Sequence, residues 1–142
     1  MAKSVKDIST FSILLLISMT IFTLLGLELY AYKIQFLDHE LTRPKSLGDS
    51  KSKGYSPRLN FDTAVNSFIT IFTVIVGDDW NAIMYSHYRV LVASKLYGEA
   101  YFTLGFFIFL FIVGNFVLLN LFLAILLANF DLESDKPEIE DE

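Results

Sequence analysis

Two long apolar runs constrain this chain more than any other feature of its sequence. Residues 100–130 contain no charged residue, and residues 11–32 contain only Glu28, near the end of the run. A helix needs about 20 apolar residues to cross the hydrocarbon core of a bilayer. A buried helix of a soluble protein is the alternative for the first run, but the run shows no amphipathic face. The sequence therefore predicts an outer transmembrane helix over 11–32 and an inner one over 98–130.

The overall composition agrees with a multi-pass membrane protein in a lipid bilayer. Hydrophobic residues make up 54% of the chain and charged residues only 19%, which is too apolar for an ordinary soluble domain. The net charge of -5 argues against a nucleic-acid partner, which requires a basic face. The absence of cysteine excludes disulfides and thiolate metal sites. The length of 142 residues allows a single domain.

A third apolar stretch lies between the two runs and is too short to span. Residues 63–76 are apolar and end at Gly77, Asp78, Asp79 and Trp80. Apolar stretches of this length are read as re-entrant or interfacial. A helix lying on the membrane surface is the alternative, but such helices carry Lys or Arg on their polar face and this stretch has neither. We predict an all-α membrane protein with a re-entrant loop between two transmembrane helices. The loop consists of a first pore helix (61–76), a filter (76–80) and a second pore helix (80–90).

The remaining segments are polar. Residues 33–60 are rich in Lys, Ser, Gly and Pro and form the predicted extracellular turret loop, whereas residues 131–142 form an acidic cytoplasmic tail. The loop holds six basic residues, so the rule that places Lys and Arg in the cytoplasm predicts the opposite orientation. The sequence leaves this conflict open.

The short apolar stretch carries the residues that a cation filter needs. Asp62 is the predicted N-cap of its helix, and Gly77 can adopt the backbone angles of a tight turn. Asp78 and Asp79 supply oxygen atoms, the ligands that hard cations prefer, and rings of acidic side chains select cations. One Asp78 cannot surround an axis, so we expect about four modules around a central pathway. Two carboxylates about 8 Å apart repel by about 2 kcal/mol at an effective dielectric constant near 20. A divalent cation relieves several such terms, which favours calcium over sodium provided that the other modules are also acidic.

Structural roles are the alternative for each of these residues. Asp79 can serve as the N-cap of helix 80–90, and Asp78 can do so if the helix starts one residue earlier. Trp80 is predicted to be a packing anchor whose indole N–H needs an acceptor. His87 and Arg89 are expected to be solvated at the outer mouth. The T-V-G-Y-G motif of potassium filters is absent, which argues against potassium selectivity.

Two segments resemble a known family. Residues 73–85 read T-V-I-V-G-D-D-W-N-A-I-M-Y and residues 114–125 read G-N-F-V-L-L-N-L-F-L-A-I. They resemble the pore loop and the sixth segment of four-repeat voltage-gated calcium and sodium channels, nearest to a calcium-channel second repeat. Residues 26–30, G-L-E-L-Y, resemble the end of the fifth segment. Asp78 stands where that repeat usually has Glu, and Val76 where it usually has Thr.

The resemblance implies roles for individual residues. Val76, Gly77, Asp78 and Asp79 fall in the selectivity filter, with Asp78 as the cation-binding acid, and Trp80 falls on the filter anchor. On the inner helix, pore-lining or gate roles are implied for residues that share one face at i, i+4 and i+7. These residues are Asn120, Ala124 and Leu127. An interhelical hydrogen bond is the alternative role for Asn120.

These observations together predict a pore-forming module of a voltage-gated-type cation channel in the plasma membrane. We expect it to be calcium-permeable and to supply one quarter of the filter and gate, with three further pore modules as partners. No cofactor is expected beyond the permeant cation. No helix carries Arg or Lys at every third position, so the voltage sensor is not in this chain. Whether the chain is a fragment or a separate subunit stays open.

Other functions are kept as alternatives. The module can conduct sodium or cations without selectivity, or it can be a non-conducting membrane subunit that uses the fold for assembly only. An intramembrane enzyme with Asp78 and Asp79 as a catalytic pair is disfavoured, because adjacent side chains point differently and rarely form a working dyad. We therefore expect the chain not to be an enzyme.

Overall fold

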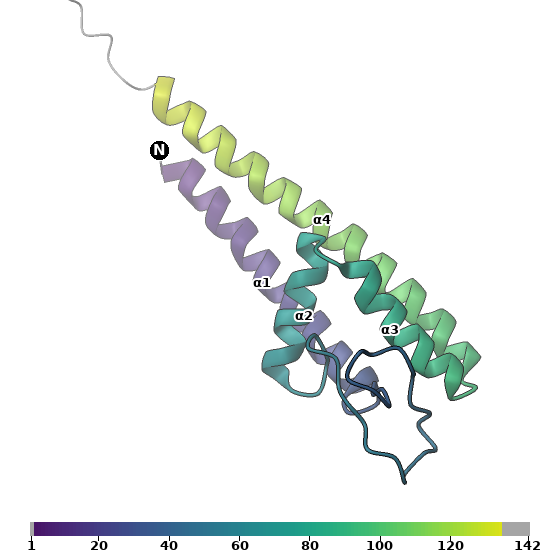
Figure 1. Cartoon of the computed structure of the whole chain (residues 1–142). Coiled ribbons are helices and arrows are strands. Elements are labelled where there is room, and N and C mark those ends of the chain that lie inside the picture. Colours follow the sequence, from purple (N-terminus) through teal and green to yellow (C-terminus); the bar gives the residue numbers. More distant parts are fainter. Residues whose placement is uncertain (1, 135–142) are drawn as a thin grey trace, which may run out of the picture.

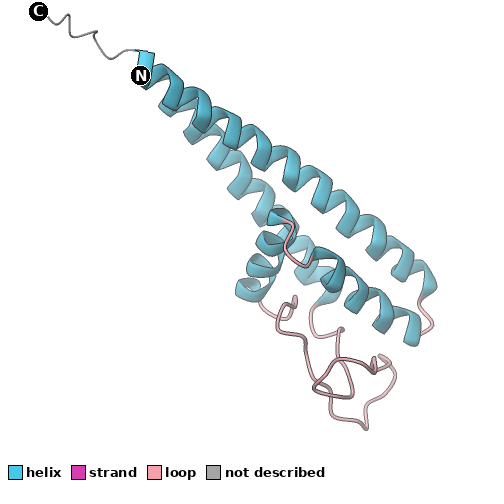
Figure 2. Cartoon of the chain, turned by 45° about the horizontal axis from the view of Figure 1, so that its top comes forward, coloured by secondary structure: helices cyan, strands magenta, loops and turns pink. Residues whose placement is uncertain are grey.

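The computed structural model describes residues 2–134 and contains four helices. They are α1 (Ala2–Tyr30), α2 (Ala64–Val76), α3 (Trp80–Ala93) and α4 (Tyr97–Ser134). The long helices α1 and α4 run side by side, and the short helices α2 and α3 pack beside the half of this pair that lies far from the N-terminus (Figure 1). The start of α1 and the end of α4 lie at the same end of the molecule, the long loop before α2 and the connection between α3 and α4 lie at the other, and the turn between α2 and α3 lies midway (Figure 2). No strand occurs within residues 2–134, apart from two isolated bridges in the loop.

Helices α1 and α4 are long and apolar enough to cross a membrane. Only 11% and 17% of their most apolar windows are buried within the chain, so they are not core helices of a soluble domain. Both carry large exposed apolar side chains along their length, which lipid or further protein must cover. The predicted all-α class with two transmembrane helices is therefore confirmed.

The helix boundaries differ from the predicted ones. The outer helix, predicted over 11–32, begins at Ala2, because residues 2–10 contain no Gly or Pro to stop it. The inner helix, predicted over 98–130, continues to Ser134 and takes in the first residues of the predicted tail. The rest of that tail, residues 135–142, lies outside the described residues.

The first short helix begins later than predicted, and Asp62 is not its N-cap. The cap is Thr63, whose side-chain oxygen accepts from the backbone N–H of Asn66 at 3.2 Å. The Asp62 carboxylate instead accepts from the Tyr32 N–H at 2.8 Å and from the Ser56 hydroxyl at 3.0 Å. It therefore fastens the chain that enters α2 to the end of α1.

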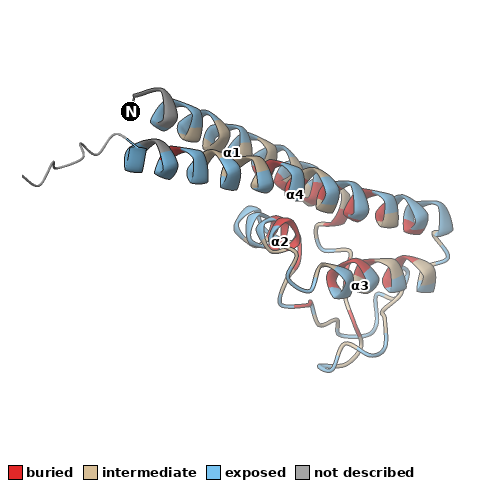
Figure 3. Ribbon diagram, turned by 90° about the horizontal axis from the view of Figure 1, so that it is seen from above, coloured by how far each residue is buried: buried red, intermediate tan, exposed pale blue. Residues whose placement is uncertain are grey.

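An aromatic cluster fills the space between α1, α3 and α4. The buried positions of the chain gather where the short helices α2 and α3 lie beside α1 and α4 (Figure 3). At the centre of the aromatic cluster lies His87, fully buried, with ring centroids 5.0–5.3 Å from those of Tyr30, Phe61 and Phe107. The predicted solvated position of His87 is therefore wrong. Its Nδ1 lies 2.8 Å from the Ile83 carbonyl oxygen, and burial lowers its pKa to about 4.

The turret loop, predicted over 33–60, runs from residue 31 to 63 and is held to the short helices. Phe36 forms bridges with Pro44 and Tyr55 and is fully buried. The exposed Arg89 of α3, predicted to be solvated, donates to the carbonyl oxygens of Leu41 and Thr42. The loop thus rests on the second half of α3.

Candidate functional site

The turn between α2 and α3 is built by the end of α2. Gly77 has a left-handed backbone with φ 85°, which favours glycine. Its N–H donates to the carbonyl oxygens of Thr73 and Val74, and the Asp78 N–H donates to Thr73 at 3.1 Å. This closed turn ends α2 and directs the chain away from the helix axis. Val76 ends the helix with its side chain 51% exposed.

The two carboxylates of the turn are exposed and unengaged. Neither Asp78 nor Asp79 has a side-chain hydrogen bond or ion pair with any residue in the described part of the chain. Asp79 occupies the N-cap position of α3 with a left-handed φ of 48°, but its side chain makes no capping bond. The capping role considered for Asp79 therefore does not use its carboxylate, and both acids are left open to an outside cation.

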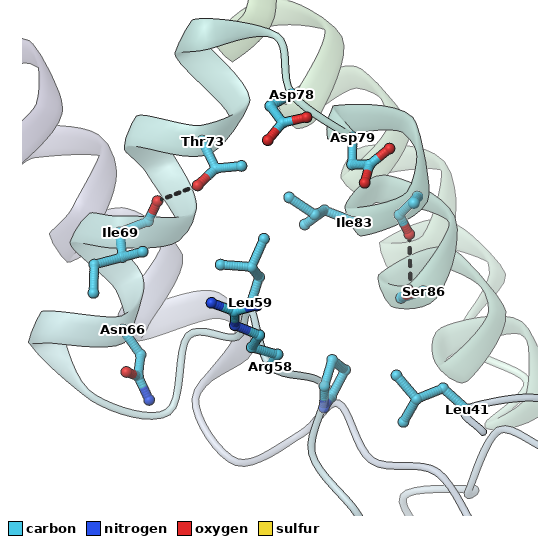
Figure 4. A pocket seen from close by; sticks show the side chains of 12 residues that line it. Leu41, Arg58, Leu59, Asn66, Ile69, Thr73, Asp78, Asp79, Ile83 and Ser86 are labelled. Atoms are coloured by element: carbon cyan, nitrogen blue, oxygen red, sulfur yellow. Dashed lines mark hydrogen bonds between the residues drawn. The ribbon is translucent and has the colours of Figure 1, made fainter. Parts of the chain in front are cut away.

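Both acids line a pocket of ≈ 670 Å³ between α2, α3 and the loop. They lie along one rim, and Arg58 reaches in from the opposite side (Figure 4). Thr73 and Ser86 also line it, but their hydroxyls donate to carbonyl oxygens of their own helices at 2.8 and 2.9 Å. The two carboxylates are therefore the strongest free oxygen ligands along this wall.

No group of three or more His, Asp or Glu within the described residues could hold a metal ion. Two adjacent carboxylates leave most of the six to eight oxygen positions of calcium unfilled. A cation bound at Asp78 must therefore take its other ligands from water, backbone carbonyls or further chains.

Trp80 is held by a stacking contact that the sequence did not reveal. Its ring stacks on that of Phe111 of α4, with ring centroids 4.5 Å apart and planes 19° apart. The indole N–H has no hydrogen-bond partner among the residues described here. Trp80 thus packs on the inner helix, its predicted role as filter anchor stays a prediction, and an acceptor for its N–H is not found within these residues. Nothing in the sequence distinguishes Phe111 from the other 13 phenylalanines.

The predicted pore-lining residues lie far along α4 from this turn. Asn120 and Ala124 are half-buried and Leu127 is exposed. Asn120 lies nine residues beyond Phe111, or about 14 Å along the helix axis. The structure therefore does not bring these residues to the filter, and their predicted role concerns the opposite end of the module.

Two membrane-spanning helices and an intervening helix pair that presents free carboxylates define a pore-type membrane module. Residues 1–138 match the family described as ion transport protein. The chain belongs to this family.

Similarity to individual relatives points to calcium channels. The chain is 34% identical over 126 residues to the voltage-dependent L-type calcium channel subunit alpha-1S of Aquarana catesbeiana, which covers 89% of this chain and 6% of the relative. It is 34% identical over 132 residues to the voltage-dependent L-type calcium channel subunit alpha-1D of Homo sapiens, which covers 92% of this chain and 5% of the relative. It is 33% identical over 122 residues to the muscle calcium channel subunit alpha-1 of Musca domestica, covering 86% and 6%.

The chain thus spans less than a tenth of the length of these relatives. The resemblance to voltage-gated calcium channels, predicted from the pore-loop and inner-helix motifs, is confirmed by these similarities.

Proposed function

We propose that this chain is a pore-forming module of a voltage-gated-type, calcium-permeable cation channel in the plasma membrane. It contributes one quarter of a selectivity filter centred on Asp78, together with one inner helix of the gate. The observation that carries the proposal is the free, exposed Asp78 carboxylate at the end of a helix too short to span. Membership of the ion transport family supports it.

The direction of α2 adds to the attraction for cations. The C-terminal end of a helix carries the equivalent of about half a negative charge, because the peptide dipoles along the helix are aligned. Helix α2 ends at Val76, two residues before Asp78, so its negative end and the carboxylate lie together. A cation near the turn is therefore stabilised by both, while an anion is repelled by both.

Calcium is favoured over sodium by the repulsion between like modules. Two carboxylates about 8 Å apart repel by about 2 kcal/mol at an effective dielectric constant near 20. Four modules around one axis multiply this repulsion, and a divalent ion offsets more of it than a monovalent ion does. Asp78 is one methylene shorter than glutamate, so its carboxylate lies farther from such an axis. A longer acid at this position is therefore expected to strengthen the preference.

Three further pore modules are the partners that this arrangement needs. Apolar side chains on α4 are exposed over much of its length. Asn115 and Asn129 are also exposed on this helix, and polar groups facing lipid are costly. The Asn115 amide nitrogen donates to the Phe111 carbonyl oxygen at 2.8 Å, but the Asn115 amide oxygen and the Asn129 amide have no hydrogen-bond partner among the described residues. Neighbouring modules or a water-filled pathway would satisfy them, whereas lipid would not.

The test is the calcium-to-sodium permeability ratio of the assembled channel, taken from reversal potentials. Asp78→Asn removes the charge while keeping the side-chain size, and it is expected to lower the ratio by roughly tenfold. Glu40→Gln removes an exposed charge of the turret loop in the same way and is expected to leave the ratio unchanged.

Asp78→Glu tests whether the length of the acid limits the preference for calcium over sodium. A calcium-to-sodium permeability ratio above that of wild type indicates that the short Asp78 side chain limits it. An unchanged ratio and current in Asp78→Asn would instead assign the chain to an assembly role without conduction.

A further inference from the structure

Phe111 stacks on one end of the filter turn and lies near the other end. Its ring stacks on Trp80 at 4.5 Å between centroids, and its Cε2 lies 3.4 Å from the point where a Cβ of Gly77 would stand. These two positions flank Asp78 and Asp79 on either side. One aromatic ring of the inner helix therefore stacks on Trp80 at one end of the four-residue turn and lies beside Gly77 at the other.

A second contact fixes the distance between the inner helix and α2. Gly114 lies three residues after Phe111, on the same side of α4. A Cβ added to it would stand 2.5 Å from Cγ1 of Ile75, which is itself buried. Glycine thus allows α4 and α2 to approach closely at this level. The Phe111 ring is held against the turn by backbone packing as well as by its own stacking.

Few other contacts hold the turn in place. The Trp80 indole N–H is unpartnered among the described residues, and the carboxylates of Asp78 and Asp79 make no bonds there. Val76 offers no hydroxyl that could tie the turn to a neighbour, and its side chain is exposed. The hydrogen bonds of Gly77 and Asp78 go back to α2 only. The stack with Phe111 is the ring contact that joins this turn to the inner helix.

We propose that Phe111 is a positioning residue of the filter, which sets the place of Asp78 through Trp80 and joins the filter to the inner helix. This inference rests on the proposed role of Asp78 in permeation. A movement of α4 along this part of its length would displace the turn, so the ring also provides a route between the inner helix and the filter.

The first experiment reads the stack directly and does not depend on conduction. Trp80 is the only tryptophan of the chain, so the intrinsic fluorescence of the purified chain in detergent reports on it alone. Phe111→Leu is expected to raise the population of detached Trp80 by about two- to tenfold, seen as faster quenching by acrylamide. Phe111→Tyr keeps the ring and should retain wild-type quenching. The control Phe116→Leu changes a phenylalanine of α4 that is 65% exposed, and it should also match wild type.

The second experiment measures the calcium-to-sodium permeability ratio of the assembled channel with the same variants. Phe111→Leu is expected to lower the ratio by about two- to tenfold, while Phe111→Tyr and Phe116→Leu retain it. If acrylamide quenches Trp80 fluorescence equally in Phe111→Leu and Phe116→Leu, the stack between Phe111 and Trp80 does not hold Trp80 in place. Faster quenching with an unchanged ratio would overturn the positioning role. An Asp78→Asn variant with the wild-type ratio would refute the proposed function itself, which separates the two failures.

Discussion

The close approach of α2 and α4 at Gly114 yields the sharpest stability prediction. A Cβ at this position would lie 2.5 Å from Cγ1 of Ile75 and 3.1 Å from both Cβ and Cγ2 of the same residue. Carbon atoms in contact normally stand 3.5–4.0 Å apart. Gly114→Ala must therefore push α2 and α4 apart or force Ile75 from its rotamer. Overpacking of this kind costs about 1–3 kcal/mol.

The intrinsic helix preference works in the opposite direction and can be measured separately. Alanine is favoured over glycine within a helix by about 1 kcal/mol. Gly105 lies on the same helix with nothing within 4 Å of its virtual Cβ, so Gly105→Ala reports this preference alone. We expect the free energy of unfolding of Gly114→Ala to lie about 1–3 kcal/mol below that of Gly105→Ala.

The assay is reversible unfolding of the chain in mixed micelles, followed by its helical circular dichroism. Ile75→Ala removes the two Cγ atoms that crowd position 114, and alone it is expected to cost about 2–5 kcal/mol through the cavity it leaves. In the double variant the new methyl group enters that cavity, so the two costs should not add. Equal stability of Gly114→Ala and Gly105→Ala, or strict additivity in the double variant, would refute this packing argument.

Two further predictions concern the aromatic cluster. Burial lowers the pKa of His87 to about 4, from about 6.5 in the unfolded chain. The unfolded state therefore binds the proton more readily, so stability is full above pH 6.5 and falls by up to about 3 kcal/mol toward pH 4. Melting temperatures between pH 7.5 and 4.5 should show this loss, and His87→Phe should lack it; an equal loss in both would exclude His87 as the cause. Tyr30→Phe removes the buried 3.0 Å hydrogen bond to Thr103 and should cost about 1 kcal/mol in unfolding titrations, whereas Tyr32→Phe, 69% exposed, should cost almost nothing.

The architecture could be predicted from the sequence because the membrane imposes simple length rules. A run of 31 uncharged residues at positions 100–130 allows few outcomes other than a span. The stretch that ends at Gly77 is too short for one, and glycine followed by two acids indicates where it must turn. These signals are local in the chain and need no knowledge of what packs against them.

Tertiary contacts determine the N-cap of α2 and the burial of His87, which the sequence alone did not predict. Asp62 and Thr63 are both competent N-caps, and Thr63 takes the role because the Tyr32 N–H and the Ser56 hydroxyl occupy the Asp62 carboxylate. His87 has polar chemistry but lies on the face of α3 that meets aromatic rings from α1 and α4.

The contact of Phe111 with Trp80 could not be predicted from the sequence, because it too is a tertiary contact. The stack of the two rings joins residues 31 positions apart, and no local pattern marks that pairing. The predicted filter roles of residues 76–79 and the predicted pore-lining roles of Asn120, Ala124 and Leu127 stay predictions, because these roles concern an assembled pore.

The measurement that tests the central claim most directly is calcium block of the sodium current through the assembled channel. A divalent ion about 8 Å from one carboxylate gains about 1 kcal/mol at the dielectric constant of water and about 4 kcal/mol at a value near 20. Removal of the Asp78 charge in Asp78→Asn should therefore raise the half-blocking calcium concentration by roughly fivefold or more. A half-blocking concentration equal to that of wild type would contradict the assignment of Asp78 to the filter.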